Sequence, residues 1–278
     1  MKSLGLKADD RYFSICGINI KAVNVQPLEF SGLAPVYAKN YEVFHSDSVD
    51  YSIELKITQD INFQGTSVVD SFMRDEYLHN SASGWHIVFD AEFRYFRGEC
   101  LNTLDAWFGA LKASLATYLV HTKRGILLHA SSGIMNERVY VIPGASGVGK
   151  STAISKIPGK ILCDEITGVT LENNSIHVWS TPFGGDIMPS GNTGAPVIFI
   201  DIVKDNTDYI CSFSGNKEML IMKSSVFPGG DEEFNLKFLE TVAAISRNFN
   251  VQTVGATRQA EFWSIFAGRE IQNENNSL

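Results

Sequence analysis

Residues 144–151 read Gly-Ala-Ser-Gly-Val-Gly-Lys-Ser, and this stretch decides which fold we expect. It fits the Walker A pattern, in which four residues separate two glycines and Lys-Ser follows. The glycines let the backbone curl so that several N–H groups point at a phosphate chain. We expect Lys150 to reach the β and γ phosphates of a nucleotide and Ser151 to bind Mg²⁺. The expected nucleotide-binding residues are Gly144, Ala145, Ser146, Gly147, Val148, Gly149, Lys150, Ser151 and Thr152.

The residues around the loop predict strands on both sides of it. Two short apolar segments, 125–130 and 138–142, are separated by an Asn-Glu turn at 136–137. Strands joined by so short a connection form an antiparallel hairpin, and the second strand runs directly into the loop. A helix is expected from Lys150 to a point before Pro158, followed by a strand over 160–163.

Two carboxylates follow that strand directly. Asp164 and Glu165 come 14 and 15 residues after Lys150. Ligands gather at the carboxyl ends of strands in α/β proteins, so both side chains are expected to face the phosphates. One would complete the Mg²⁺ shell, and the other could accept the proton of an attacking hydroxyl. The alternative is a solvated acidic turn. A Walker B strand usually lies much farther along a chain, which makes this short spacing informative.

The rest of the chain predicts two regions, a β-rich domain over 1–100 and a P-loop domain over 101–278. Alternating apolar and aromatic residues predict strands in the first region, at 12–20, 41–44, 51–57 and 86–95. The second is expected to begin with an amphipathic helix over 104–119 that links the two halves. Further elements are expected downstream: a hairpin of 169–171 and 176–179, a buried strand over 196–203, and helices over 217–226, 232–248 and 258–266.

Composition excludes several classes of protein. The chain is 44% hydrophobic and 19% charged, with a net charge of -8, which argues against a nucleic-acid or anionic-membrane binder. Its four cysteines are scattered, as expected for reduced thiols. No apolar run approaches the roughly 18 residues that span a bilayer, and the first residues lack the apolar core of a signal peptide. We therefore expect a cytoplasmic location.

Three runs of residues together resemble the HPr kinase/phosphorylase superfamily. They are Leu-Leu-His-Ala-Ser at 127–131, the hairpin into 144–151, and Leu-Cys-Asp-Glu at 162–165. The chain looks most like the divergent HPr-kinase-related branch, which residues 181–186 and 195–203 also fit. The likeness covers residues 101 to about 268, and the N-terminal part agrees only as a β-rich extension.

The resemblance implies an α/β fold, a phosphoenolpyruvate-carboxykinase-like P-loop core with a mixed sheet. It implies transfer of a phosphoryl group from ATP to a seryl hydroxyl. Carried over by motif, His129 is the phosphate-proximal histidine and Asp164 the catalytic base. Glu165 takes the place of a second aspartate and is one methylene longer. Asp186 takes that of a metal-proximal acidic residue, where relatives often carry glutamate, so the resemblance implies Ser151, Glu165 and Asp186 at the metal. From the sequence alone, a lone histidine in an apolar strand is more often a core residue than a functional one.

Two arginines are candidates for stabilising charge on a transferring phosphoryl group. Arg258 is favoured over Arg247, because Gly-Ala-Thr at 255–257 indicates a loop leading into a helix. From the sequence alone, an arginine at either position is more often a helix-surface residue than a functional one.

We expect an ATP- and Mg²⁺-dependent kinase that phosphorylates a serine of a peptide or protein, or a small-molecule hydroxyl. The main alternative is a non-catalytic nucleotide-binding regulator. A carboxykinase-type lyase would need a separate lysine–histidine metal set, which we do not find. The hairpin that enters the loop argues against a nucleoside kinase with a parallel sheet. Well-known relatives form hexamers, but no feature demands this, so the acceptor, the nucleotide and the oligomeric state stay open.

Overall fold

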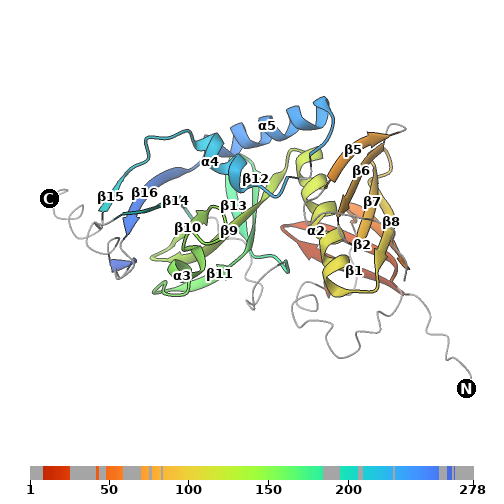
Figure 1. Ribbon diagram of the computed structural model, residues 1–278, viewed down its shortest axis with the longest axis horizontal. Helices are drawn as coiled ribbons and strands as arrows, with labels where there is room; N and C mark the ends of the chain where they lie inside the picture. The colour runs from red at the N-terminus through yellow and green to blue at the C-terminus, as the bar shows by residue number, and fades with distance from the viewer. Residues whose placement is uncertain are drawn as a thin grey trace, which may run out of the picture. The chain divides into compact units, whose positions relative to one another are not determined.

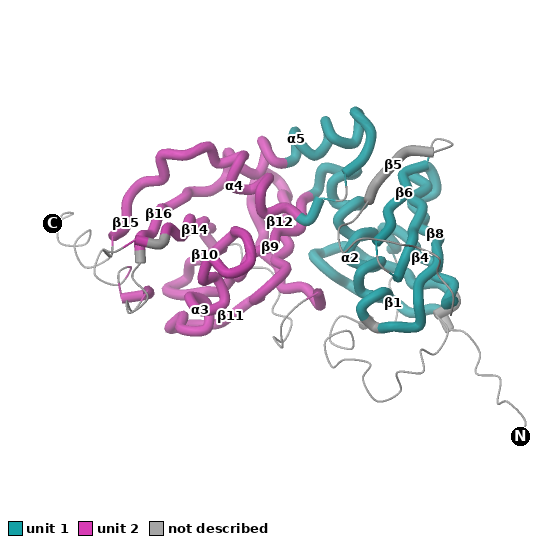
Figure 2. The backbone as a smooth tube through the Cα atoms, viewed as in Figure 1, with its two compact units in different colours: residues 1–124, 226–241 teal, residues 125–225, 242–278 magenta. Residues whose placement is uncertain are grey.

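A computed structural model of the protein describes the strands and helices of Figure 1. Its described residues are 9–25, 42–43, 48–58, 70–74, 77–82, 84–183, 195–205, 209–227, 229–256, 262–264 and 266. The chain divides into two compact units, residues 1–124 with 226–241 and residues 125–225 with 242–278 (Figure 2). The fold is mixed α/β and consists mostly of strands, as expected. The division lies at residue 124, whereas the sequence suggested a boundary at residue 100.

The first unit is built on an eight-stranded mixed sheet. Its strands follow the order β3-β1-β2-β4-β8-β7-β6-β5, and only the pairs β2–β4 and β4–β8 are parallel. Along β4, β6 and β7, buried and partly exposed residues alternate, as in a sheet with one covered face. The strands are β1 (Asp9–Ile15), β2 (Ile18–Val25), β3 (Glu42–Val43), β4 (Tyr51–Thr58), β5 (Asp70–Arg74), β6 (Tyr77–Ala82), β7 (Trp85–Asp90) and β8 (Tyr95–Leu101).

Helix α2 (Leu104–His121) covers the buried face of this sheet, which explains why the unit extends past residue 100. Thr103 caps the helix, because its hydroxyl accepts a hydrogen bond from the backbone N–H of Ala106 at 3.2 Å. Buried polar pairs join helix and sheet. Tyr51 and Ser114 lie 3.0 Å apart, hydroxyl to hydroxyl. The helix therefore belongs to the first sheet's core.

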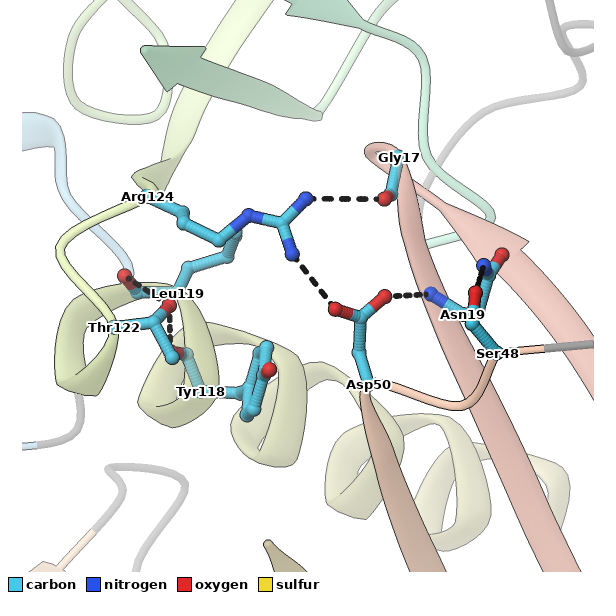
Figure 3. Close-up of polar contacts among 8 residues, drawn as sticks. All are labelled: Gly17, Asn19, Ser48, Asp50, Tyr118, Leu119, Thr122 and Arg124. Carbon is cyan, nitrogen blue, oxygen red and sulfur yellow. Dashed lines mark hydrogen bonds and ion pairs between the residues drawn. The ribbon is translucent and has the colours of Figure 1, made fainter. Parts of the chain in front are cut away.

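The end of α2 is tied to the first sheet by an ion pair (Figure 3). Arg124 donates from Nη1 to Asp50 Oδ1 at 2.8 Å and from Nη2 to the carbonyl of Gly17 at 3.3 Å. The second oxygen of Asp50 accepts from the backbone N–H of Asn19 at 2.8 Å. The Asp50 carboxylate, just before β4, thus links the start of β2 to Arg124. Arg124 in turn contacts the β1–β2 turn through Gly17.

The second unit is built on another mixed sheet, in the order β13-β12-β9-β10-β14-β16-β15, with β11 also paired to β9. Strands β10, β14 and β16 are parallel to one another, and the remaining pairs are antiparallel. The strands are β9 (Gly125–Met135), β10 (Arg138–Pro143), β11 (Lys160–Cys163), β12 (Ile166–Glu172), β13 (Ser175–Trp179), β14 (Val197–Lys204), β15 (Tyr209–Ser212) and β16 (Asn250–Ala256).

Helix α3 (Lys150–Ile154) packs on β9 and shares a hydrophobic core with Phe262, Trp263 and Phe266. A Cβ at Gly133 would lie 2.9 Å from Ile157 Cδ1 and 3.0 Å from Ile154 Cδ1, so the absence of a side chain at Gly133 lets these isoleucines pack closely against β9. The buried indole of Trp263 donates to the carbonyl of Ala153 at 2.6 Å. This bond fixes the end of the helix that follows the Walker A loop.

Most sequence-based elements of the second unit are confirmed. The hairpin β9–β10 turns at Asn136 and Glu137, whose φ angles of 48° and 58° suit a tight hairpin turn. Strand β11 has the expected bounds, and β12–β13 form the expected antiparallel pair. Helices α4 (Lys217–Ser224) and α5 (Glu232–Ser246) end two residues earlier than expected. The helix expected over 258–266 lies mostly outside the described residues.

Other expectations were wrong in detail. Residues 12–20 form a hairpin, not one strand, because Cys16 and Gly17 adopt positive φ angles of 57° and 69°. Residues 86–95 likewise contain the turn between β7 and β8. In contrast, the helix after the loop begins at Lys150 and ends at Ile154, before Pro158, as expected. Within the described part of the chain, no helix is long and apolar enough to cross a membrane.

Candidate nucleotide-phosphate site

The Walker A residues form a loop between β10 and α3. Three of its glycines need backbone angles that other residues rarely adopt, with φ of 149° at Gly144, 81° at Gly147 and 105° at Gly149. A Cβ at Gly147 or Gly149 would meet no atom within 4 Å, so the requirement there is conformational and not steric. The sequence pattern therefore reflects the curled backbone that a phosphate cradle needs.

Lys150 points into this loop. It is only 4% exposed, which is unusual for a lysine. Its Nζ donates to the carbonyls of Gly144 at 2.8 Å and Ala145 at 2.9 Å. Burial lowers the pKa of Lys150, while the nearby carboxylates of Asp164 and Glu165 act in the opposite direction. An ammonium group is thus held inside the loop, next to two acidic side chains.

Strand pairing brings the loop and the acidic pair to one level of the sheet. Strand β9 lies between β10 and the run β11–β12. On one side, the backbone N–H of Gly144 donates to the carbonyl of His129 at 3.2 Å. On the other side, the N–H of Ala130 donates to the carbonyl of Glu165 at 3.0 Å. Strands β10 and β11 both run antiparallel to β9. The segments that follow their carboxyl ends therefore lie on either side of His129, Ala130 and Ser131 in β9.

The carboxylate of Asp164 is held by a serine that we did not single out as a site residue from the sequence. Counting the β9–β12 register back from Ile166↔His129 places Asp164 opposite Ser131. The Ser131 hydroxyl lies 2.8 Å from the carbonyl oxygen of Asp164 and 2.9 Å from its Oδ1. Ser131 is fully buried. The sequence feature that could have identified Ser131 is its spacing from His129. It follows His129 by two residues, which places both side chains on the same face of β9.

His129, the loop and both carboxylates line one cavity of about 420 Å³. This volume lies in the range of small-ligand pockets. His129 is half-buried, so it is neither a core histidine nor a freely exposed one. The described lining residues are His129, Ser146, Gly147, Gly149, Lys150, Ser151, Thr152, Asp164 and Glu165.

The remaining site predictions do not meet at this cavity among the described residues. Asp186 and Arg258 lie outside the part of the chain that the structure describes. Arg247 is described and exposed, and its Nε donates to the carbonyl of Ala243 at 2.9 Å. It is not among the residues that line the cavity. Arg247 thus lies exposed in the turn after α5 (Glu232–Ser246), away from the described lining of the cavity.

The cavity offers few side chains of the kind that bind a magnesium ion. No group of three or more His, Cys, Asp and Glu side chains within the described ranges could hold a metal ion. Ser151 and Glu165 both line the cavity and both offer oxygen, the donor that Mg²⁺ prefers. Because Mg²⁺ usually takes one or two protein ligands and completes its shell with phosphate and water oxygens, this pair suits a nucleotide-bound ion.

The fold and the cavity define a mixed α/β protein with a Walker A loop at the end of a sheet strand. No protein-family model matches the chain. No curated protein is significantly similar to it in sequence. Its function is therefore inferred from the residues of the site.

Proposed function

We propose that this protein is an ATP-dependent kinase that transfers the γ-phosphoryl group to a hydroxyl, either a seryl group of a peptide or protein or that of a small molecule. The observation that carries the proposal is the shared cavity of Lys150, Asp164 and His129. A phosphate-binding loop alone supports nucleotide binding. A carboxylate oriented beside that loop supports chemistry on the bound phosphate as well. The resemblance to the HPr kinase/phosphorylase superfamily points the same way.

The loop and Lys150 would bind the phosphates. The ammonium of Lys150 donates to two carbonyls of its own loop. In the proposed complex it would donate to a phosphate oxygen instead. Phosphoryl transfer depends mainly on positioning and on neutralising charge, which a buried ammonium provides. A Mg²⁺ ion held by Ser151 and Glu165 would neutralise further phosphate charge.

Asp164 would act as the general base. The acceptor oxygen forms a bond to the γ-phosphorus, while the bond from that phosphorus to the oxygen bridging the β-phosphate breaks. The hydroxyl proton passes to the carboxylate of Asp164, and the nucleoside diphosphate leaves with the electron pair. The hydrogen bond from Ser131 restricts which way this carboxylate points. His129 lies on the same face of β9 as Ser131 and lines the same cavity, so in this proposal it would contact the phosphates.

The test combines nucleotide binding with transfer. Wild-type protein is incubated with γ-labelled ATP and Mg²⁺, with free L-serine, serine-containing peptides or small alcohols as acceptors. Asp164→Asn should keep nucleotide affinity and lose transfer by about 10²- to 10⁴-fold, the usual contribution of a general base. Lys150→Ala should weaken nucleotide binding. Glu137→Gln, in the exposed turn of the β9–β10 hairpin, is the matched control and should behave as wild type.

Each other outcome has a definite meaning. Nucleotide binding without transfer to any acceptor class would favour a non-catalytic regulator. Transfer that survives Asp164→Asn would assign the base to another group. Failure of the wild-type protein to bind ATP or GTP would show that the loop does not bind a nucleotide.

A further inference from the structure

Two histidines meet on the face of the first sheet opposite to the one that α2 covers. His79 in β6 and His86 in β7 are both half-buried, and their neighbours along each strand are buried. Across β6–β7, His79 is paired with Val88 and His86 with Ser81, so the two histidines are diagonal neighbours on one face. Diagonal positions lie within reach of long side chains. The strand register therefore brings two imidazole rings together in the unit that does not contain the Walker A loop.

The two rings face each other through nitrogen atoms. Nδ1 of His79 lies 3.1 Å from Nε2 of His86, and the ring planes are 17° apart. One ring donates the hydrogen of this contact and the other accepts it. Moving that hydrogen to the other nitrogen of the donating ring leaves two lone pairs at the contact and changes the charge of neither imidazole. The pair can therefore present two neutral nitrogen donors side by side.

The spacing of these nitrogens suits two ligands of one metal ion. Imidazole nitrogens bind Zn²⁺ at about 2.0–2.1 Å. Two nitrogens 3.1 Å apart that both lie at that distance from one ion subtend an angle of about 95–102°, between the octahedral and the tetrahedral angles. Ligation requires the rings to turn from facing each other to facing the ion. Both side chains keep accessible surface on this face of the sheet.

Glu99 is the nearest acidic residue in the adjoining strand. It is the cross-strand partner of His86 on β8 and is exposed, with a 3.7 Å contact to the exposed Lys56. Its negative charge favours a cation beside the pair. Among the described residues, however, no three His, Cys, Asp or Glu side chains are grouped closely enough to hold a metal ion. Water would therefore fill the remaining positions, which is the arrangement of an exchangeable ion and not of a structural zinc with four protein ligands.

We infer that His79 and His86 together bind a divalent transition-metal ion of the kind that imidazole prefers, such as Zn²⁺. The ion takes Nδ1 of His79 and Nε2 of His86, and water completes its shell. The site is separate from the loop, where Mg²⁺ would use oxygen donors, and it does not depend on the function proposed there.

The test maps the ion to these two side chains. The full-length protein, free of any histidine tag, is treated with diethyl pyrocarbonate with and without ZnCl₂, and modification of each histidine is followed by mass spectrometry. A nitrogen whose lone pair binds the ion cannot attack the reagent. Zn²⁺ at about ten times its Kd should therefore slow modification of His79 and His86 about tenfold. His121, half-buried in the last turn of α2, is the internal control and should react at an unchanged rate.

Single substitutions then show whether the two rings share one ion. In His79→Asn, Zn²⁺ should no longer protect His86, and in His86→Asn it should no longer protect His79. An unchanged reaction rate of His121 in both variants shows that the first unit remains folded. Mg²⁺ should give no protection, because it prefers oxygen ligands. The inference is overturned if Zn²⁺ protects neither histidine, if protection of one survives loss of the other, or if Mg²⁺ protects them equally well.

Discussion

Replacing Ser131 with alanine isolates the contact that orients the proposed base. The Ser131 hydroxyl lies within 2.9 Å of both the carbonyl oxygen and Oδ1 of Asp164, yet it has one hydrogen to donate. The variant therefore loses about one hydrogen bond, and the carboxylate is free to rotate. No other group in the proposed mechanism is altered, because Ser131 itself does not line the cavity.

The expected magnitude follows from the nature of this bond. A hydrogen bond to a charged group contributes about 1.5–3 kcal/mol, and the partial exposure of Asp164 favours the lower end. A loss of about 1.4 kcal/mol from transition-state stabilisation slows a reaction tenfold. We therefore expect transfer to fall by about tenfold, with nucleotide affinity unchanged because the loop and Lys150 are intact. The melting temperature should fall as well, since the folded state loses this one hydrogen bond.

Ser132 provides a matched control in the next position of β9. It is equally buried, but its hydroxyl lies 3.1 Å from that of Thr167 and makes no contact with Asp164 among those described. Ser132→Ala should therefore lower stability by about 1 kcal/mol and leave transfer unchanged. Transfer and ATP affinity are measured on both variants, with melting temperature as the measure of stability. Equal transfer rates for the two variants would refute a positioning role for Ser131.

Three further predictions concern stability. Trp263→Phe keeps an aromatic ring but removes the N–H donor to α3, so we expect a loss of about 1–3 kcal/mol in thermal or urea unfolding; an unchanged midpoint would contradict this. Asp50→Asn should lower the free energy of unfolding by about 1–2 kcal/mol, after allowance for the partial exposure of the ion pair. Arg124→Gln added to this variant should lower it little further, because the pair is already broken; fully additive losses would show that the two residues are not coupled. Burial, with a smaller effect of the neighbouring His79, lowers the pKa of His86 below 6.5. As the pH falls below 6.5, His86 therefore takes up a proton in the unfolded chain before it does so in the folded protein, and the free energy of unfolding decreases. His86→Gln should make the free energy of unfolding depend less on pH, as measured by unfolding curves at several pH values; an unchanged pH dependence would contradict this.

The sequence predicted the second unit better than the first. Around the loop, local signals agree with one another: apolar strands, an Asn-Glu turn, a glycine-rich loop and an acidic pair after a strand. In the first unit, the turn at Cys16–Gly17 was missed, because an isolated glycine within a strand-like run can mark a bulge as well as a turn. The boundary between the units was also missed. The apolar face of α2 predicts burial but does not say which sheet covers it.

The sequence by itself predicted the loop, the histidine and the acidic pair that line the cavity, although it did not single out Ser131. The pattern at residues 144–151 requires a curled backbone, and the spacing to Asp164 is short enough for one helix and one strand to bring the two together. Only the tertiary structure decided how those groups face one another. The long-range pairing of β9 with β10 on one side and with β11–β12 on the other sets His129, Ser131 and Asp164 at one level. Register across strands depends on packing over the whole sheet, so no local stretch of sequence specifies it.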